Sequence, residues 1–320
     1  METHVATLER TNVKTFSPFA GMTLDIGPAR YQFVASPHFQ DEQEVFAVEG
    51  GEALVYQLRN VVSDTLHALK VMKPVYRTDR YVRVAHVFAN FKDMPGFALA
   101  DRLCLTKSDH SRLIADFPDL EYATLMPWLP GKTWAGLLVD RKASARYTLE
   151  KARRLATLTA DLLWHFESHN LAHTDIAGGN VMLASNLQGV DVLDVEGMYM
   201  PGIAPPHWNS QGTPGYQHRH LDKRGQWRPE GDRFAGAMLL TEMLTWWNPL
   251  VRAHTPDDAD ALFSPGELQT VGFPRWQAVR DTLWTVNPEL LHLFDNAWAS
   301  PDLDRCPDLT TWAMCLVAPS

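Results

Sequence analysis

LAHTDIAGGNVML, residues 171–183, brings several chemically useful side chains into one short segment. A carboxylate, Asp175, and a carboxamide, Asn180, stand five residues apart, and two consecutive glycines, Gly178 and Gly179, lie between them. An apolar run of three residues closes the segment. This order predicts a polar loop that leads into a buried strand.

Asp175 and Asn180 are side chains that phosphoryl transfer could use. That reaction needs an oxygen base beside the incoming hydroxyl group, and oxygen ligands for the magnesium ion that neutralises the phosphates. Aspartate and asparagine are also common in turns, so the same spacing alone would suit an ordinary loop.

A further carboxylate follows this segment. Asp194 follows the run VDVL, residues 190–193, and Val195, Glu196 and Gly197 come after it. A loop, a strand, a tight connection and a second strand form a hairpin, which would present Asn180 and Asp194 to one point as two metal ligands.

Three segments resemble motifs of the protein kinase family. HTDIAGGN, residues 173–180, is similar to the family's H-R-D-x-x-x-x-N loop, and VLDVEG, residues 192–197, is similar to its D-F-G strand end. HALK, residues 67–70, resembles its V-A-I-K strand. The resemblance covers roughly residues 44–315. It implies an α+β, bilobal protein kinase-like fold with a small antiparallel β-rich N-lobe and a larger, mainly helical C-lobe.

The domain boundaries that we expect follow this resemblance. Residues 1–43 would form an N-terminal extension with short strands, residues 44–129 the N-lobe and hinge, and residues 130–320 a helical C-lobe with the catalytic loop and activation segment. A chain of 320 residues with 45% apolar composition can form a large core in one or two lobes.

The N-lobe residues would bind the nucleotide. Residues 44–59 alternate around a pair of glycines as a hairpin would, and in the family this hairpin covers the ATP phosphates. Lys70 follows Val55 by fifteen residues, the family spacing, in an apolar strand where an ammonium group needs an anionic partner. The apolar segment 120–129 resembles a strand that runs into the hinge. The residues expected to bind ATP are Gly50, Gly51, Val55, Lys70, Leu125, Met126 and Trp128.

The resemblance also assigns catalytic roles. It makes Asp175 the base, with Lys70 and Asn180 as further catalytic residues, and it makes Asn180 and Asp194 the ligands of Mg²⁺. His173 would be a structural residue of the loop.

The segment 231–246 is apolar nearly all round, which predicts a central buried helix. Asp232, near its start, matches the family aspartate that holds the backbone of the catalytic loop. A helix N-cap is the simpler interpretation of Asp232, and both roles are compatible.

The chain departs from the family after Lys70. The segment 79–92 has helical apolar spacing through Val82, Ala85, Phe88 and Ala89, yet no carboxylate lies between its first residue and Asp93. The family has a glutamate in this helix that pairs with the lysine.

Three other residues bear on this departure. Glu196 is one available substitute as the partner of Lys70. Thr174 and Ala177 replace an arginine and a lysine of the family's catalytic loop.

A second departure concerns the segment GTPGYQHRH, residues 212–220, which resembles the end of a kinase activation segment. His218, Arg219 and His220 stand where the family has A-P-E, and Cys306 stands where the family has the arginine that pairs with that glutamate. Because both halves of the ion pair are absent together, we expect a structural compensation.

Three functions fit these residues. An atypical Ser/Thr protein kinase, of the bacterial kind, is favoured because the lysine, the asparagine and both aspartates are all present. A pseudokinase that binds nucleotide as a scaffold is favoured by the missing helix glutamate, the sparse glycine loop and Ala177. A small-molecule kinase of the aminoglycoside phosphotransferase type shares D-x-x-x-x-N, but the GTPGY segment is closer to protein kinases.

The resemblance implies ATP and an unidentified protein substrate as partners, and composition excludes several other classes of partner. A formal net charge of -9 argues against nonspecific nucleic-acid binding. The three cysteines lack C-x-x-C spacing, which suggests neither a disulfide framework nor a zinc site. No apolar run is long enough to cross a bilayer, and the first residues lack the apolar core of a signal peptide, so we expect a cytoplasmic protein.

Overall fold

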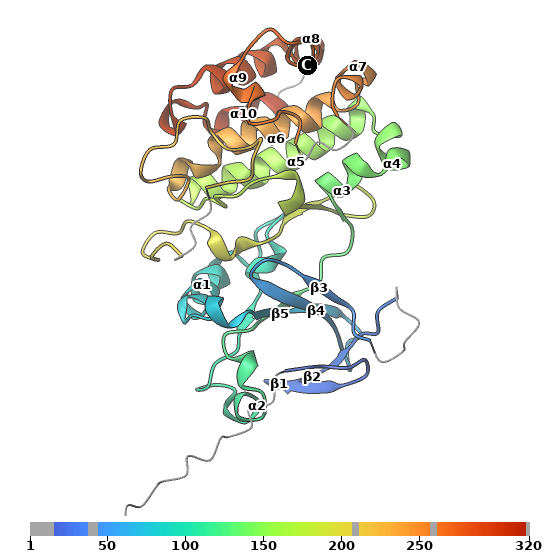
Figure 1. The fold of residues 1–320 in the computed structure, drawn as a ribbon, viewed down its shortest axis with the longest axis vertical. Helices are drawn as coiled ribbons and strands as arrows, with labels where there is room; N and C mark the ends of the chain where they lie inside the picture. The colour runs from blue at the N-terminus through green and yellow to red at the C-terminus, as the bar shows by residue number, and fades with distance from the viewer. Residues whose placement is uncertain (1–15, 38–43, 207–210, 257–260, 318–320) are drawn as a thin grey trace, which may run out of the picture. The chain divides into compact units, whose positions relative to one another are not determined.

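The computed structural model describes residues 16–37, 44–206, 211–256 and 261–317 (Figure 1). Contacts between Cα atoms divide the chain into two compact units. One is Met1–Ala89 with Asp101–Trp128, and the other is Asn90–Ala100 with Leu129–Ser320. We refer to them as the N-terminal and the C-terminal unit. The expected mixture of α and β structure is confirmed, with an antiparallel sheet in the N-terminal part and helices in the C-terminal part.

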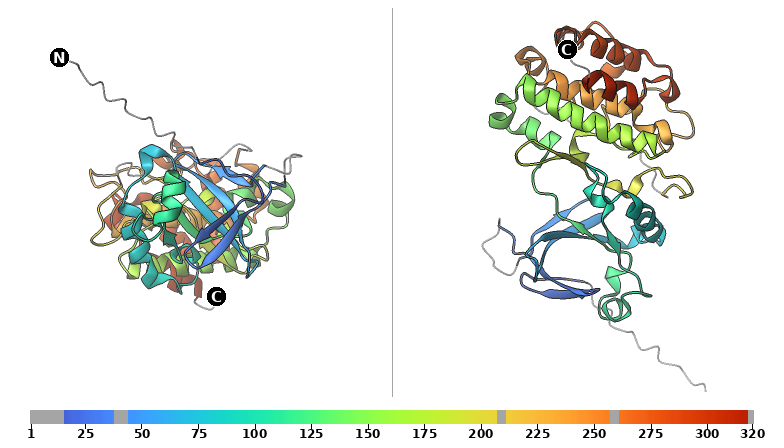
Figure 2. Two further views of the ribbon diagram at one scale, coloured as in Figure 1. Left: turned by 90° about the horizontal axis from the view of Figure 1, so that it is seen from below. Right: turned by 180° about the vertical axis from the view of Figure 1, so that it is seen from behind.

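The sheet of the N-terminal unit is curled, as Figure 2 shows, and all its strand pairs are antiparallel. Its order is β1-β2-β4-β5-β7-β6, and β3 pairs with β4. The strands are β1 Thr23–Ile26, β2 Ala29–Phe33, β3 Ala47–Glu49, β4 Ala53–Asn60, β5 Leu66–Met72, β6 Leu103–Cys104 and β7 Thr124–Pro127. The expected hairpin is β3–β4. The short strands β1 and β2 join the same sheet, because β2 pairs with β4.

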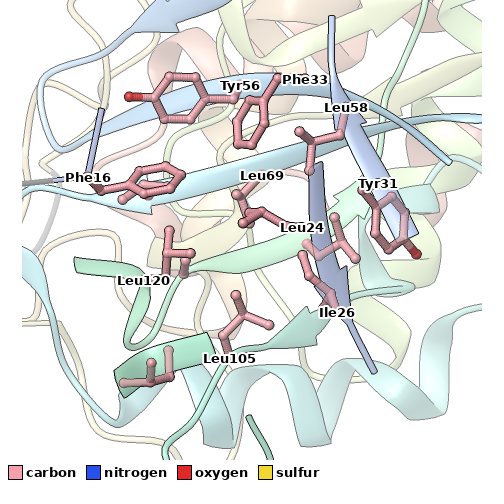
Figure 3. Packing of buried hydrophobic residues seen from close by; sticks show 14 residues of the cluster. Phe16, Leu24, Ile26, Tyr31, Phe33, Tyr56, Leu58, Leu69, Leu105 and Leu120 are labelled. Carbon is pink, nitrogen blue, oxygen red and sulfur yellow. The ribbon is translucent and has the colours of Figure 1, made fainter. Parts of the chain in front are cut away.

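A compact apolar core lies inside this sheet (Figure 3). Phe16 packs edge-on against Tyr56, with ring centroids 5.9 Å apart, and Leu58 and Leu69 are completely buried. Residues before β7, including Leu120, complete the core. The register of β4 and β5 is therefore fixed by burial, since a shift of one residue would turn these side chains outward.

Two predictions for the N-terminal unit need correction. The helix expected over 79–92 is α1 Arg80–Phe88, followed by a 3₁₀ turn at Ala89–Phe91. Its buried face contains Tyr81, Val84 and Phe88, whereas Val82 is 37% exposed. Positions 81, 84 and 88 have the same helical spacing as the face that we expected, so periodicity alone could not choose between the two faces.

The strand expected within 120–129 is also shorter, because β7 begins only at Thr124. A 3₁₀ turn at Pro118–Leu120 comes before it, and Tyr122 adopts a left-handed backbone with φ 66°. The unit contains one further short helix, α2 Ser111–Asp116.

The C-terminal unit is built on two long helices, α5 Leu149–Ser168 and α6 Arg233–Thr245, which pack against each other. Every residue of α6 from Phe234 to Thr245 is buried, so the predicted central helix is confirmed. The remaining helices are α3 Trp134–Val139, α4 Arg141–Ala145, α7 Pro249–Ala253, α8 Pro274–Val286, α9 Pro288–Ala299 and α10 Leu309–Val317. Within the described ranges, no helix combines the length and the apolar character that a membrane crossing requires.

A small sheet of order β10-β9-β8 lies in the same unit. Its strands are β8 Lys132–Thr133, β9 Val181–Leu183 and β10 Val190–Val192. The loop that leads into a buried strand and the hairpin after it are therefore both confirmed.

Candidate functional site

The backbone of the loop between α5 and β9 is anchored by Asp232, which lies at the start of α6. The Asp232 carboxylate is buried and accepts two backbone hydrogen bonds, from the N–H of His173 at 2.5 Å and from the N–H of Thr174 at 2.7 Å. It accepts no bond from the first turn of α6, so the helix-capping interpretation is wrong. Two obligatory donors of a buried loop thus find their acceptor on the central helix.

His173 connects the loop to the end of β10. Its ring is almost completely buried, and Nε2 lies 2.6 Å from the carbonyl oxygen of Leu193. Because a carbonyl only accepts, Nε2 carries the proton in this pair. His173 therefore positions the chain just before Asp194. The next residue, Thr174, has φ 67° and donates its hydroxyl to the carbonyl of Gly197 at 3.2 Å.

Asn180 and Asp194 are placed by the β9–β10 hairpin. The two strands pair antiparallel with Val181 opposite Val192, and the N–H of Leu193 donates to the carbonyl of Asn180 at 2.8 Å. Asp194, the next residue, has a left-handed backbone with φ 54° and is exposed. The hairpin therefore brings the two predicted metal ligands to neighbouring positions.

The side chain of Asn180 has a defined orientation. Its Nδ2 group donates to the backbone carbonyl of Asp175 at 2.8 Å. Because only the amide nitrogen can donate, Oδ1 is directed away from that carbonyl and can serve as a ligand.

This arrangement fits a magnesium ion. Mg²⁺ is bound by oxygen ligands and often takes only one or two protein carboxylates besides water and phosphate. The Asn180 amide oxygen and the Asp194 carboxylate are of this kind. Among the described residues, no cluster of three His, Cys, Asp or Glu side chains could hold a metal. A carboxylate–amide pair does not need such a cluster.

Asp175 is half-buried, and its carboxylate is oriented by a residue that the sequence did not reveal. Thr213 donates its hydroxyl to Oδ1 of Asp175 at 2.8 Å. Thr213 comes from the GTPGY segment, 38 residues further along the chain. Its place in that segment was the only available signal, because no local pattern links the two positions.

The same segment is tied to the central helix by Glu242, which the sequence also failed to identify. Glu242 is completely buried and accepts hydrogen bonds from the Tyr216 hydroxyl at 3.1 Å, from the Leu262 N–H at 2.6 Å and from the Trp134 indole. Burial raises the pKa of Glu242 to about 7, although the hydrogen bonds from its three donors lower this pKa.

Gly178 joins this cluster to the loop between α5 and β9. A Cβ atom at this position would lie 3.0 Å from the ring of Trp134 and 3.1 Å from the hydroxyl of Tyr216. Its neighbour Gly179 has no heavy atom within 4 Å of the same position. The two glycines therefore differ, because packing requires only the first.

Neutral groups connect His218 and Cys306, which lie in the two segments where the resemblance to kinases led us to expect no ion pair. His218 Nε2 lies 3.0 Å from the hydroxyl of Ser300, and that hydroxyl lies 3.0 Å from the sulfur of Cys306. All three residues are buried. Burial lowers the pKa of His218 and raises the pKa of Cys306 to about 11, so both are uncharged near pH 7. This chain of hydrogen bonds connects the segment 212–220 to residues 300 and 306.

In the N-terminal unit, Lys70 lies at the centre of β5. It faces Val55 of β4 on one side and Thr124 of β7 on the other, and it is buried. Leu125 and Met126 are in β7, opposite Leu69 and Ala68, and the ring of Trp128 packs edge-on against Phe46.

Gly50 and Gly51 form the turn between β3 and β4. Neither has a positive φ, and a Cβ at Gly51 would meet no heavy atom within 4 Å. The backbone conformation does not require glycine here. The two glycines leave the tip of the hairpin without side chains, and we call it the bare tip.

Each unit thus gathers its own predicted residues. Val55 and Lys70 are cross-strand neighbours in the N-terminal unit, and Asp175, Asn180 and Asp194 share one scaffold in the C-terminal unit. Lys70 and Glu196 belong to different units, so their contact stays a prediction.

Comparisons with known proteins add no family assignment. No protein-family model matches the chain, and no curated protein sequence matches it.

Proposed function

We propose that this protein is an ATP- and magnesium-dependent phosphotransferase with a bilobal protein kinase-like fold. It moves the γ-phosphate of ATP to a serine or threonine hydroxyl of a protein substrate. The observation that carries the proposal is the common anchoring of Asp175, Asn180 and Asp194 by a network of buried and partly buried hydrogen bonds. A loop without a chemical task would not need a base and two oxygen ligands on one rigid support.

Asp175 is the residue that orients the acceptor hydroxyl. Thr213 binds one oxygen of its carboxylate, Oδ1, and thereby fixes the plane of the group. The other oxygen, Oδ2, then accepts the hydrogen bond of the incoming hydroxyl. The proton passes to Oδ2 as the hydroxyl oxygen bonds to the γ-phosphorus, while the bond from that phosphorus to the bridging oxygen of ADP breaks and ADP leaves.

Asn180 and Asp194 would hold the magnesium ion, through the amide oxygen and the carboxylate. When bound, this ion neutralises charge on the phosphates of ATP. In the N-terminal unit, Lys70 and the bare tip at Gly50 and Gly51 would bind phosphate oxygens. Leu125, Met126 and Trp128 would line the pocket for the adenine base of ATP.

A pseudokinase is the second candidate, and one observation favours it. Helix α1, Arg80–Phe88, contains no acidic residue, so it cannot supply a carboxylate to Lys70. Ala177 has the same implication, because it places a methyl group where the family has a lysine. Such a protein would bind ATP without transferring phosphate.

Two measurements separate these candidates. A thermal shift with ATP, with and without magnesium, reports binding, and ³²P transfer from ATP to casein or to the protein itself reports catalysis. We expect a magnesium-dependent shift together with transfer that is lost in Asp175→Asn. Asp161→Asn is the matched control, since Asp161 lies half-exposed on α5 of the same unit. A thermal shift without phosphate transfer in the wild type would favour the pseudokinase. The absence of both the shift and the transfer would exclude both candidates.

A further inference from the structure

A pocket of about 400 Å³ opens in the C-terminal unit, and none of the predicted site residues lines it. Its walls come from β8, from the α3 and α4 segments, from the start of α5 and from the turn between β9 and β10. Figure 1 shows α3 and α4 beside α5. The volume falls in the range of about 300–1,000 Å³ that is usual for ligand sites.

The interior of the pocket is apolar. Leu137 of α3 and Leu183 of β9 line it and are buried, and Leu187 lines it from the β9–β10 turn. Leu187 has φ 56°, a left-handed backbone that costs a leucine roughly 1–2 kcal/mol. Asparagine or glycine would adopt this conformation more easily, so the turn keeps an apolar side chain at the pocket despite the strain.

Three cations line the same pocket: Lys132 of β8, Arg146 after α4, and Lys151 of α5. Lys132 is paired with Asp140, and Lys151 donates to the backbone carbonyl of Arg146 at 2.8 Å. Within the described ranges, neither Arg146 nor Lys151 forms an ion pair with a carboxylate. Their positive charge is therefore available to a ligand.

The charge of this region is opposite to that of the chain. Residues 132–154 contain seven lysine or arginine residues and only two acidic residues, whereas the whole chain has a formal charge of -9. Both acids have other partners: Asp140 pairs with Lys132, and Glu150 pairs with Arg154 at 3.0 Å. A local basic patch on an acidic protein attracts an anionic partner to this place.

We propose that this pocket is a docking site for an acidic linear segment of a partner protein, with an apolar side chain between its carboxylates. The apolar side chain enters against Leu137, Leu183 and Leu187, and the carboxylates pair with Arg146 and Lys151. An extended segment suits the site because the cations come from separate elements, so several carboxylates can be engaged at once. This proposal is independent of phosphate transfer.

The test is fluorescence anisotropy with a labelled peptide of sequence EDELDE and the full-length protein. We expect binding that weakens as salt increases, and weakens about tenfold in Arg146→Glu. The control is Lys142→Glu, which makes the same charge change on α4 at a residue outside the pocket lining. It should weaken binding by no more than about twofold, because Lys142 contributes only long-range attraction that salt screens. A peptide without the apolar residue, EDEGDE, and a neutral one, QNQLNQ, should bind at least tenfold more weakly.

Leu187→Asn separates docking from a merely structural role. Asparagine tolerates the left-handed backbone, so this variant should be as stable as the wild type or more stable, yet bind EDELDE several-fold more weakly. Three outcomes would overturn the proposal. They are no binding at millimolar peptide, equal binding by Arg146→Glu and wild type, and binding of 4-methylpentanoate as tight as that of the peptide. The last result would identify a small-anion site.

Discussion

Glu242 shows at the scale of one residue how burial and hydrogen bonding compete. Three donors converge on its carboxylate, which favours the ionised form, but complete burial favours the protonated form more strongly. The resulting pKa of about 7 lies above the ordinary value of 4.5. The folded protein therefore binds more protons at Glu242 than the unfolded chain does between these two values.

This shift predicts a pH dependence of stability. Because the folded pKa of Glu242 is raised, its contribution is fully present below about pH 4.5 and is lost as pH rises through 7. The loss amounts to about 3 kcal/mol, from 1.36 kcal/mol per pKa unit. Urea unfolding of the wild type and Glu242→Gln at pH 5, 6, 7 and 8 tests it. The difference between the two free energies of unfolding should shrink as pH rises, and a constant difference would refute the assignment.

Three elements meet at Gly178 of the loop between α5 and β9. A Cβ atom added at this position would meet Trp134 at the start of α3 and Tyr216 of the GTPGY segment, and both of these donate hydrogen bonds to Glu242 on α6. The loop, helix α3 and the GTPGY segment therefore pack together at one junction. Added volume at Gly178 should displace all three elements, since packed interiors tolerate little extra volume.

Gly178→Ala should therefore destabilise the protein by about 1–3 kcal/mol, as overpacking of a buried site does. Gly179→Ala is the matched control, because the added methyl group meets open space. It should change the free energy of unfolding by less than about 0.5 kcal/mol. Chemical denaturation measures both, and equal effects of the two substitutions would show that the junction does not constrain Gly178.

The elements also show what the sequence could predict and why the rest was missed. Helix α6 was predictable because it is apolar all round, and the β9–β10 hairpin because two apolar runs flank a short turn. The buried face of α1 was not, since Val82 and Tyr81 are adjacent apolar residues and only tertiary contacts select between them.

The site residues that could not be predicted from the sequence were missed for a different reason. Thr213, Glu242 and Ser300 act through contacts with residues far away in the chain, and no local spacing announces such a contact. Asp175, Asn180 and Asp194 could be proposed from the sequence because they lie within one short stretch and each side chain suits a specific role in the predicted chemistry. The resemblance to kinases supplied the role of Asp232, which periodicity alone would have assigned to a helix cap.

At the scale of the whole molecule, the predicted nucleotide residues are divided between the two units. The N-terminal unit carries Lys70 and the bare hairpin tip, and the C-terminal unit carries Asp175, Asn180 and Asp194. A phosphotransferase needs both sets, whereas a regulatory scaffold could lose the base without losing nucleotide. The two aspartates therefore have separable roles under the proposed function.

The most direct test compares Asp175→Asn with Asp194→Asn, measuring the Kd for ATP with magnesium and the turnover number for phosphate transfer. Asp175→Asn should leave the Kd within about twofold and lower turnover by about 10²–10⁴-fold, because it removes a general base. Asp194→Asn should weaken magnesium-dependent ATP binding and lower turnover as well, because it removes a metal ligand. Mild and equal effects of both substitutions on Kd and turnover would contradict the proposed function.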